Sequence, residues 1–214
     1  HFAWDDAPQH PTVRAQQVRF EEACDELARA GVRPPLRHLA NSAATLTNPS
    51  AHFDLVRPGL AVYGLSPVPD LGDSAHFGLR EAMRVTARLS VVKRAAAGQG
   101  VSYGHEYVTD RDTVLGLVPM GYADGIPRAA GGAGPMLVGD RRLTIAGRVC
   151  MDQVVLDLGP DFAGAAGDEV VVLGRAADGE PSAQDWAQAA GTINYEIVTR
   201  MSPRLPRVLL GGPF

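Results

Sequence analysis

Lysine is nearly absent from this sequence: Lys93 is the single lysine among 20 basic residues, and arginine makes up the rest. Acidic residues outnumber basic ones, and the formal net charge of −4 leaves no basic stripe of the kind that binds nucleic-acid phosphates or anionic lipid. The two cysteines, Cys24 and Cys150, lie far apart and outside any CxxC or Cys/His pattern. A disulfide framework and a structural zinc site are therefore both disfavoured, and we expect no metal.

Long apolar runs are also missing, so no segment approaches the length of a membrane span. The N-terminus, HFAWDDAPQH, has neither the basic start nor the apolar middle of a signal peptide. We therefore expect a cytoplasmic protein that acts on a small molecule. The chain opens with His1 rather than methionine, from which we expect it to be a piece of a longer polypeptide.

The first third of the chain alternates helix and strand signals, as parallel α/β proteins do. Apolar residues recur at helical spacing over residues 11–30. The short apolar segment 36–40 predicts a strand, which leads into a helix capped by Asn41 and Ser42. A second apolar run, residues 60–63, predicts the next strand.

After a connection rich in proline, glycine and serine, the pattern changes to repeated strands, so we place a domain boundary near residue 77. The predicted elements are strands at residues 85–92, 113–118, 143–148, 154–158, 169–173 and 207–210, and helices at residues 182–190 and 194–201. The predicted fold class is α/β followed by mostly β, with residues 1–76 as the first domain and 77–214 as the second.

Two motifs of the first domain are candidates for binding an anion. Asn41 and Ser42 stand at a strand-to-helix junction, where free backbone N–H groups attract phosphate, although a plain N-cap is the more common explanation. Arg57 offers a planar donor fork next to Gly59, which lets the backbone approach an anion closely. A surface salt bridge beside a turn explains this second motif equally well.

Tyr122, in the motif GYADG, directly follows an apolar strand and is a candidate proton-transfer group. Taken alone, the motif is better explained by an aromatic ring packed over a tight turn. Cys150 lacks the His/Asn pattern that would support a nucleophile, and His76 and His105 lack partners at metal-ligand spacing. Each of these residues is generic in isolation.

Taken together and in chain order, seven motifs closely resemble those of the alanine racemases: HLANSAA, DLVRPGLAVYG, VSYG, GYADG, GRVCMDQ, GDEVVVLG and TINYE. The resemblance runs from His1 to about Leu210. The family's fold is a TIM-type (β/α)8 barrel that binds pyridoxal 5'-phosphate, followed by a C-terminal β-rich domain. The resemblance therefore implies a partial barrel in residues 1–76 and a β-rich domain in residues 77–214.

The resemblance also implies which residues bind the cofactor. Arg57 would meet the pyridine nitrogen, His1 would stack beside the ring, and Asn41 would support the phosphate cradle. The phosphate itself would be held by Ser42, Gly59, Leu60 and Tyr195.

Racemisation removes a proton from one face of Cα and returns one to the other face, so it needs two proton-transfer groups. In the family these are a tyrosine, which maps to Tyr122, and the cofactor lysine, while His1 and Arg57 share a hydrogen-bond network with the tyrosine. Met151 would offer its backbone N–H to the carboxylate of the substrate, alanine, in the partner's site, which implies a homodimer. Positions around the substrate entryway match Asp6, Arg148 and Ile193.

The sequence departs from the family in lacking two residues, the cofactor lysine and a carboxylate-binding arginine. Lys93 does not replace the cofactor lysine, because it lies in a predicted strand outside every matching motif. Three interpretations stay open. The chain is part of an alanine racemase that supplies D-alanine for peptidoglycan, or a non-catalytic dimerisation or interaction module, or part of a racemase that acts on serine or on a broader range of amino acids.

Overall fold

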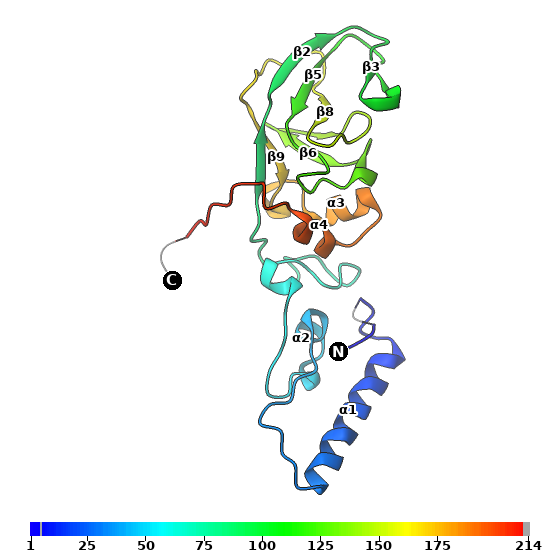
Figure 1. Ribbon diagram of the computed structural model, residues 1–214, viewed down its shortest axis with the longest axis vertical. Coiled ribbons are helices and arrows are strands. Elements are labelled where there is room, and N and C mark those ends of the chain that lie inside the picture. The colour runs from blue at the N-terminus through cyan, green and yellow to red at the C-terminus, as the bar shows by residue number, and fades with distance from the viewer. Residues whose placement is uncertain (5, 212–214) are drawn as a thin grey trace. The chain divides into compact units, whose positions relative to one another are not determined.

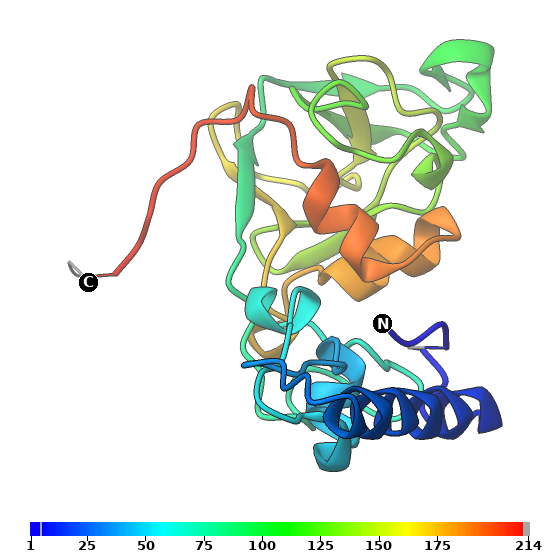
Figure 2. The same ribbon diagram turned by 60° about the horizontal axis from the view of Figure 1, so that its bottom comes forward.

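A computed structural model describes residues 1–4 and 6–211 and divides the chain into two compact units, His1–Ala82 and Met83–Phe214. Figures 1 and 2 trace both units, with α1 and α2 in the first and the strands, α3 and α4 in the second. The division falls five residues after the position 77 expected from the sequence. Among the described residues, no helix is both long enough and apolar enough to cross a membrane.

The first unit is built on α1 (Pro11–Arg29) and α2 (Ser42–Thr47), with short 3-10 turns at Pro49–Ala51 and Leu60–Tyr63. α1 begins where His10 Nδ1 accepts a hydrogen bond from the Thr12 N–H, and it ends before Gly31, whose φ of +78° suits glycine. Both helices were predicted correctly. Their buried core consists of Phe2, Val13, Leu39, Ala40, Ala44 and Ala51.

The two strands predicted for this unit are wrong. Residues 36–40 form no strand, and Leu60–Tyr63 is a 3-10 turn. Residues 37–40 do lie beside residues 54–57, because the N–H groups of Asp54 and Arg57 donate to the carbonyls of Arg37 and Ala40. A barrel strand is completed by ladders on both sides, and two isolated bonds do not make one.

The second unit contains a four-stranded sheet in the order β1-β9-β6-β7, a three-stranded sheet in the order β2-β5-β8, and a short β3-β4 pair. Figure 1 shows β2, β5 and β8 together, with β6 and β9 below them. All of the strand pairs in the part of the chain that the structure describes are antiparallel. The strands are β1 (Val85–Arg88), β2 (Val91–Ala95), β3 (Gly100–Val101), β4 (Tyr107–Val108), β5 (Thr113–Val118), β6 (Pro135–Val138), β7 (Arg141–Thr144), β8 (Val154–Asp157) and β9 (Glu169–Leu173).

The strand predictions were right for β5, β8 and β9, but the sequence missed β3, β4 and β6 and misplaced β7, which spans Arg141–Thr144 rather than 143–148. The strand predicted over 85–92 is two strands. Leu89 N–H donates to Asp168 O while Ser90 N–H donates to Leu117 O, so the chain passes from one sheet to the other at this point. The position of the break between the two strands depends on their pairing partners, which lie far away in the sequence. The local sequence pattern therefore does not predict it.

Two helices follow the strands, α3 (Ala183–Ala190) and α4 (Asn194–Arg200), and Figures 1 and 2 show them side by side. α3 begins with a reciprocal capping box between Ser182 and Asp185. Both helices agree with the prediction, but the strand predicted over residues 207–210 is wrong. Those residues pair with no strand among the described residues, and Leu209 is 93% exposed.

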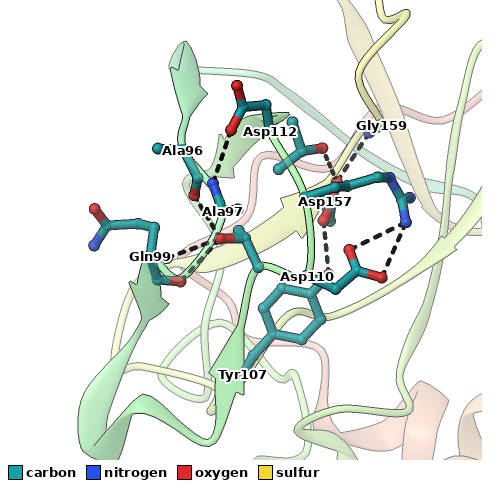
Figure 3. Close-up of polar contacts among 11 residues, drawn as sticks. Ala96, Ala97, Gln99, Tyr107, Asp110, Asp112, Asp157 and Gly159 are labelled. Carbon is teal, nitrogen blue, oxygen red and sulfur yellow. Dashed lines mark hydrogen bonds and ion pairs between the residues drawn. The ribbon is translucent and has the colours of Figure 1, made fainter.

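Asp157, the last residue of β8, is the centre of a polar network that ties Tyr107 of β4 and Thr113 of β5 to β8 (Figure 3). Its carboxylate accepts hydrogen bonds from Tyr107 Oη at 2.6 Å, Thr113 Oγ1 at 2.5 Å and the Gly159 N–H at 3.0 Å. Burial, together with the bond to Asp157, raises the pKa of Tyr107 to about 12. The network is a structural staple of the β-rich unit.

Candidate active site

Ser42 is the centre of a cradle in the first unit. Its buried Oγ accepts hydrogen bonds from the N–H of Gly59 at 2.9 Å and from that of Ala61 at 3.2 Å, so the chain around Leu60 arches over the start of α2. A hydroxyl that accepts twice still has its own proton to donate. Asn41 caps the same helix through a bond from the Ala44 N–H, as the simpler interpretation of this motif predicted.

Arg57 holds two imidazoles through its guanidinium fork. Nη1 lies 2.6 Å from His38 Nδ1, and Nη2 lies 3.2 Å from His1 Nδ1. Because arginine has no acceptor, both Nδ1 atoms accept, and each neutral ring carries its proton on Nε2. The structure thus brings together Arg57 and His1, which the sequence analysis grouped, and adds His38. That residue was missed, although it opens the motif HLANSAA.

Tyr122 lies on a loop whose backbone is hydrogen-bonded to Cys150 and Met151. The Tyr122 N–H donates to Cys150 O at 3.0 Å, and the Ala123 N–H donates to Met151 O at 2.8 Å. Gly121 makes this approach possible, since a Cβ there would lie 2.3 Å from Cys150 O. Tyr122 is 40% and Met151 58% exposed, so the predicted base and the predicted substrate-binding residue share one accessible surface.

A second tyrosine, Tyr103, follows Ser102, whose side chain contacts the segment before Met151; the sequence analysis assigned Tyr103 no role. It lies in a short turn in which Ser102, Gly104 and His105 all have positive φ. Ser102 Oγ donates to Arg148 O at 2.8 Å, and Tyr103 is 71% exposed. The motif VSYG, which contains Tyr103, is one of the motifs that resemble the family. By itself it gives no reason to prefer Tyr103 over Tyr122.

Arg148 adds charge at this surface. Its guanidinium lies 2.5 Å from Glu106 Oε1 and lowers the pKa of that carboxyl. The pair lines a cavity of about 230 Å³ together with Arg128, Ala129 and Gly131. An open pocket with two guanidiniums and one carboxylate attracts an anionic group.

The remaining predicted site residues are accessible or lie at a helix end. Asp6 is exposed in the first unit, Ile193 is the exposed N-cap of α4, and Tyr195 is half-buried in the first turn of that helix. Lys93 is exposed on β2. Among residues 1–4 and 6–211, no group of three His, Cys, Asp or Glu side chains is arranged to hold a metal ion.

Comparisons with known proteins match both units. The family model described as "Alanine racemase, N-terminal domain" matches residues 1–67, and "Alanine racemase, C-terminal domain" matches residues 82–209. Alanine racemases of Frankia casuarinae and Salinispora arenicola are 59% and 60% identical to this chain over 97% of its length. The chain spans about half the length of these curated relatives, 54% and 55%.

Solved structures agree with these sequence matches. The alanine racemase of Streptomyces lavendulae has a TM-score of 0.97 and 58% identity, with 100% of this chain and 56% of that one covered. That of Bacillus anthracis, solved with bound L-Ala-P, has a TM-score of 0.88 and 34% identity, with 99% and 54% covered. The predicted fold class, part of a TIM-type barrel followed by a β-rich domain, is confirmed, and the chain belongs to the alanine racemase family.

Proposed function

We propose that the polypeptide containing this chain interconverts L- and D-alanine with the help of pyridoxal 5'-phosphate, and so supplies D-alanine for peptidoglycan. The observation that carries the proposal is the match of two alanine racemase family models, in order, to residues 1–67 and 82–209. Identities near 60% to curated alanine racemases favour alanine over serine as the substrate. We keep the cytoplasm as the expected location.

The residues of the first unit fit the two ends of this cofactor. Ser42 has a hydroxyl proton to donate to a phosphate oxygen, and Gly59 and Leu60 lie beside it. Arg57 has its fork oriented by His1 and His38 and would meet the pyridine nitrogen. Tyr195 of the second unit is proposed as a further phosphate ligand. When bound, the cofactor provides a conjugated ring that disperses the negative charge left on Cα.

The charge state of Arg57 also affects how strongly the reaction depends on acid-base catalysis. A guanidinium remains charged and does not give a proton to the pyridine nitrogen, so the ring withdraws electrons less strongly. The chain must then move the Cα proton with well-placed groups. Covalent attachment of the cofactor needs an amine. The single lysine of this chain, Lys93, lies on β2 in the second unit. We therefore propose that the lysine that holds the cofactor comes from elsewhere in the polypeptide.

Two phenols are candidates for one of the two proton-transfer groups. The sequence predicts Tyr122, whose loop is bonded to Cys150 and Met151. The structure adds Tyr103, which is more exposed and lies in a turn with strained backbone. Because strained backbone clusters at active sites, this observation favours Tyr103 as the base, with Tyr122 beside Met151 at the substrate carboxylate.

The partner subunit is the second part of the proposal. Tyr122 and Met151 would serve the site of the neighbouring protomer in a homodimer, and Asp6, Arg148 and Ile193 would line the entryway. The pocket with Arg128 and Arg148 supports this, because its charge suits an incoming amino-acid carboxylate.

The test uses the full encoded polypeptide with pyridoxal 5'-phosphate. We expect D-alanine to form from L-alanine, with one solvent deuterium incorporated at Cα in D2O, and turnover of serine to be much slower. Borohydride treatment should fix the cofactor to a lysine outside residues 1–214. A protein that neither racemises alanine nor retains the cofactor after reduction would instead be the non-catalytic module. Equal turnover of serine would replace alanine by a broader substrate range.

A further inference from the structure

Ser102 adopts a backbone conformation that is almost restricted to glycine. Its φ is 61° and its ψ is −173°, a region in which a Cβ collides with its own backbone. Two residues later Gly104 has a φ of 74°, which glycine accepts freely, and His105 follows at 48°. Tyr103 thus stands in a turn whose strain is concentrated on Ser102, although glycine at that position would avoid it.

The hydroxyl of Ser102 offers a reason for a serine at this point. Oγ donates to Arg148 O at 2.8 Å and lies 3.4 Å from Cys150 Sγ. Gly147 lets the two segments meet, since a Cβ there would lie 3.2 Å from Ser102 Cβ and 3.0 Å from Val101 O. A glycine at 102 would relieve the strain but release this bond.

We infer that Ser102 is a positioning residue: its hydroxyl holds the strained turn that carries Tyr103 against the Arg148–Cys150 backbone, next to Met151. The inference rests on the proposed function and on the proposal that Tyr103 is the base that transfers the Cα proton. The bond fixes the distance between the turn and the segment that presents the Met151 N–H. Proton transfer depends steeply on such distances, because reacting atoms displaced by about 1 Å lose roughly a hundredfold in rate.

The test separates positioning from folding by replacing Ser102 in two ways. Ser102→Gly removes both strain and bond, and Ser102→Ala removes the bond but keeps the strain. In the cofactor-loaded full polypeptide we expect kcat to fall roughly tenfold to a hundredfold in both variants. KM for alanine and the cofactor absorbance should stay close to the parent values. The unfolding midpoint of Ser102→Gly should be at least that of Ser102→Ala.

Ser90 provides the matched control. Its Oγ also donates to a backbone carbonyl of this unit, that of Leu117 at 3.1 Å, but its φ is not positive. Ser90→Ala should leave kcat unchanged. Placing Ser102→Gly in a Tyr103→Phe background should add no further loss, since the group it positions has already been removed.

Three activity results would overturn the inference: full kcat in Ser102→Gly, an equal kcat loss in Ser90→Ala, or an undiminished additional loss in the Tyr103→Phe background. Hydrogen exchange keeps the test independent of activity. Faster exchange of the Tyr103–Glu106 amides in Ser102→Ala supports the tether, and unchanged exchange rejects it. If the parent polypeptide shows no racemisation, the proposed function fails on its own while the exchange measurement still decides the tether.

Discussion

Arg57 Nη1 lies 2.6 Å from His38 Nδ1, while the other arm of the same guanidinium lies near His1. An arginine between two imidazoles has its fork fixed in orientation without a carboxylate that would neutralise its charge. This suits a residue that must face a ring nitrogen and remain cationic.

His38→Ala should therefore weaken the site without unfolding the chain, because His38 is exposed. We expect Arg57 to lose its orientation, and the cofactor affinity and kcat of the full polypeptide to fall roughly tenfold, the lower end of the effect of removing an orienting partner. His38→Asn, which retains an acceptor, should recover part of the loss. His76→Ala, which replaces a histidine with no role in the site, is the control. Equal behaviour of His38→Ala and His76→Ala would contradict the prediction.

The phenols provide the second prediction. Tyr103→Phe tests the phenol that the structure favours as the base, and Tyr122→Phe tests the phenol chosen from the sequence; cofactor binding should stay nearly intact in both variants. We expect the variant that lacks the base to lose roughly a hundredfold or more in kcat at unchanged KM. Loss of a carboxylate contact should raise KM instead. Solvent-deuterium exchange at Cα, measured separately from each enantiomer, identifies the base, and undiminished turnover in Tyr122→Phe would end its candidacy.

Most helices and the buried strands could be predicted from local pattern, since a cap, an apolar period and a terminal glycine all lie within a few residues. α3, between Ser182 and Gly191, is an example. What the sequence could not show depends on distant backbone. The break at Leu89 and Ser90 is set by bonds to two different sheets. Tyr103 was overlooked because its turn is defined by Arg148, which lies 45 positions further along the chain.

Shared active sites make a third prediction. If phenols of one protomer serve the cradle of its partner, Arg57→Ala and Tyr103→Phe polypeptides should each be nearly inactive alone. Co-expressed and purified as a hybrid, they should regain up to about half the parental kcat, because one of two sites is then assembled from unaltered parts. Differently tagged subunits isolate the hybrid. A hybrid as inactive as its parents, at confirmed dimer stoichiometry, would place both groups in one protomer.

The last prediction concerns the Tyr107–Asp157 staple and pH. Since the pKa of Tyr107 is raised to about 12, the folded state favours the neutral phenol, and this stabilisation is complete below pH 10 and disappears as pH rises from about 10 to 12. Tyr107→Phe should lower the free energy of unfolding by about 2 kcal/mol at pH 8, as expected for a hydrogen bond to a charged group.

The same reasoning predicts the pH below which the stabilisation by Asp157 is lost. Hydrogen bonds from Thr113, Tyr107 and the Gly159 N–H outweigh burial and lower the pKa of Asp157, so its contribution is present above its usual pKa and is lost as pH falls through the lowered value. Urea unfolding at pH 3, 8 and 11 should show the difference between parent and Tyr107→Phe largest at pH 8. Tyr103→Phe is the matched tyrosine-to-phenylalanine control, because the Tyr103 side chain is mostly exposed. A difference that stays constant from pH 8 to 11 would mean that Tyr107 packs in the fold without holding Asp157 through its hydroxyl.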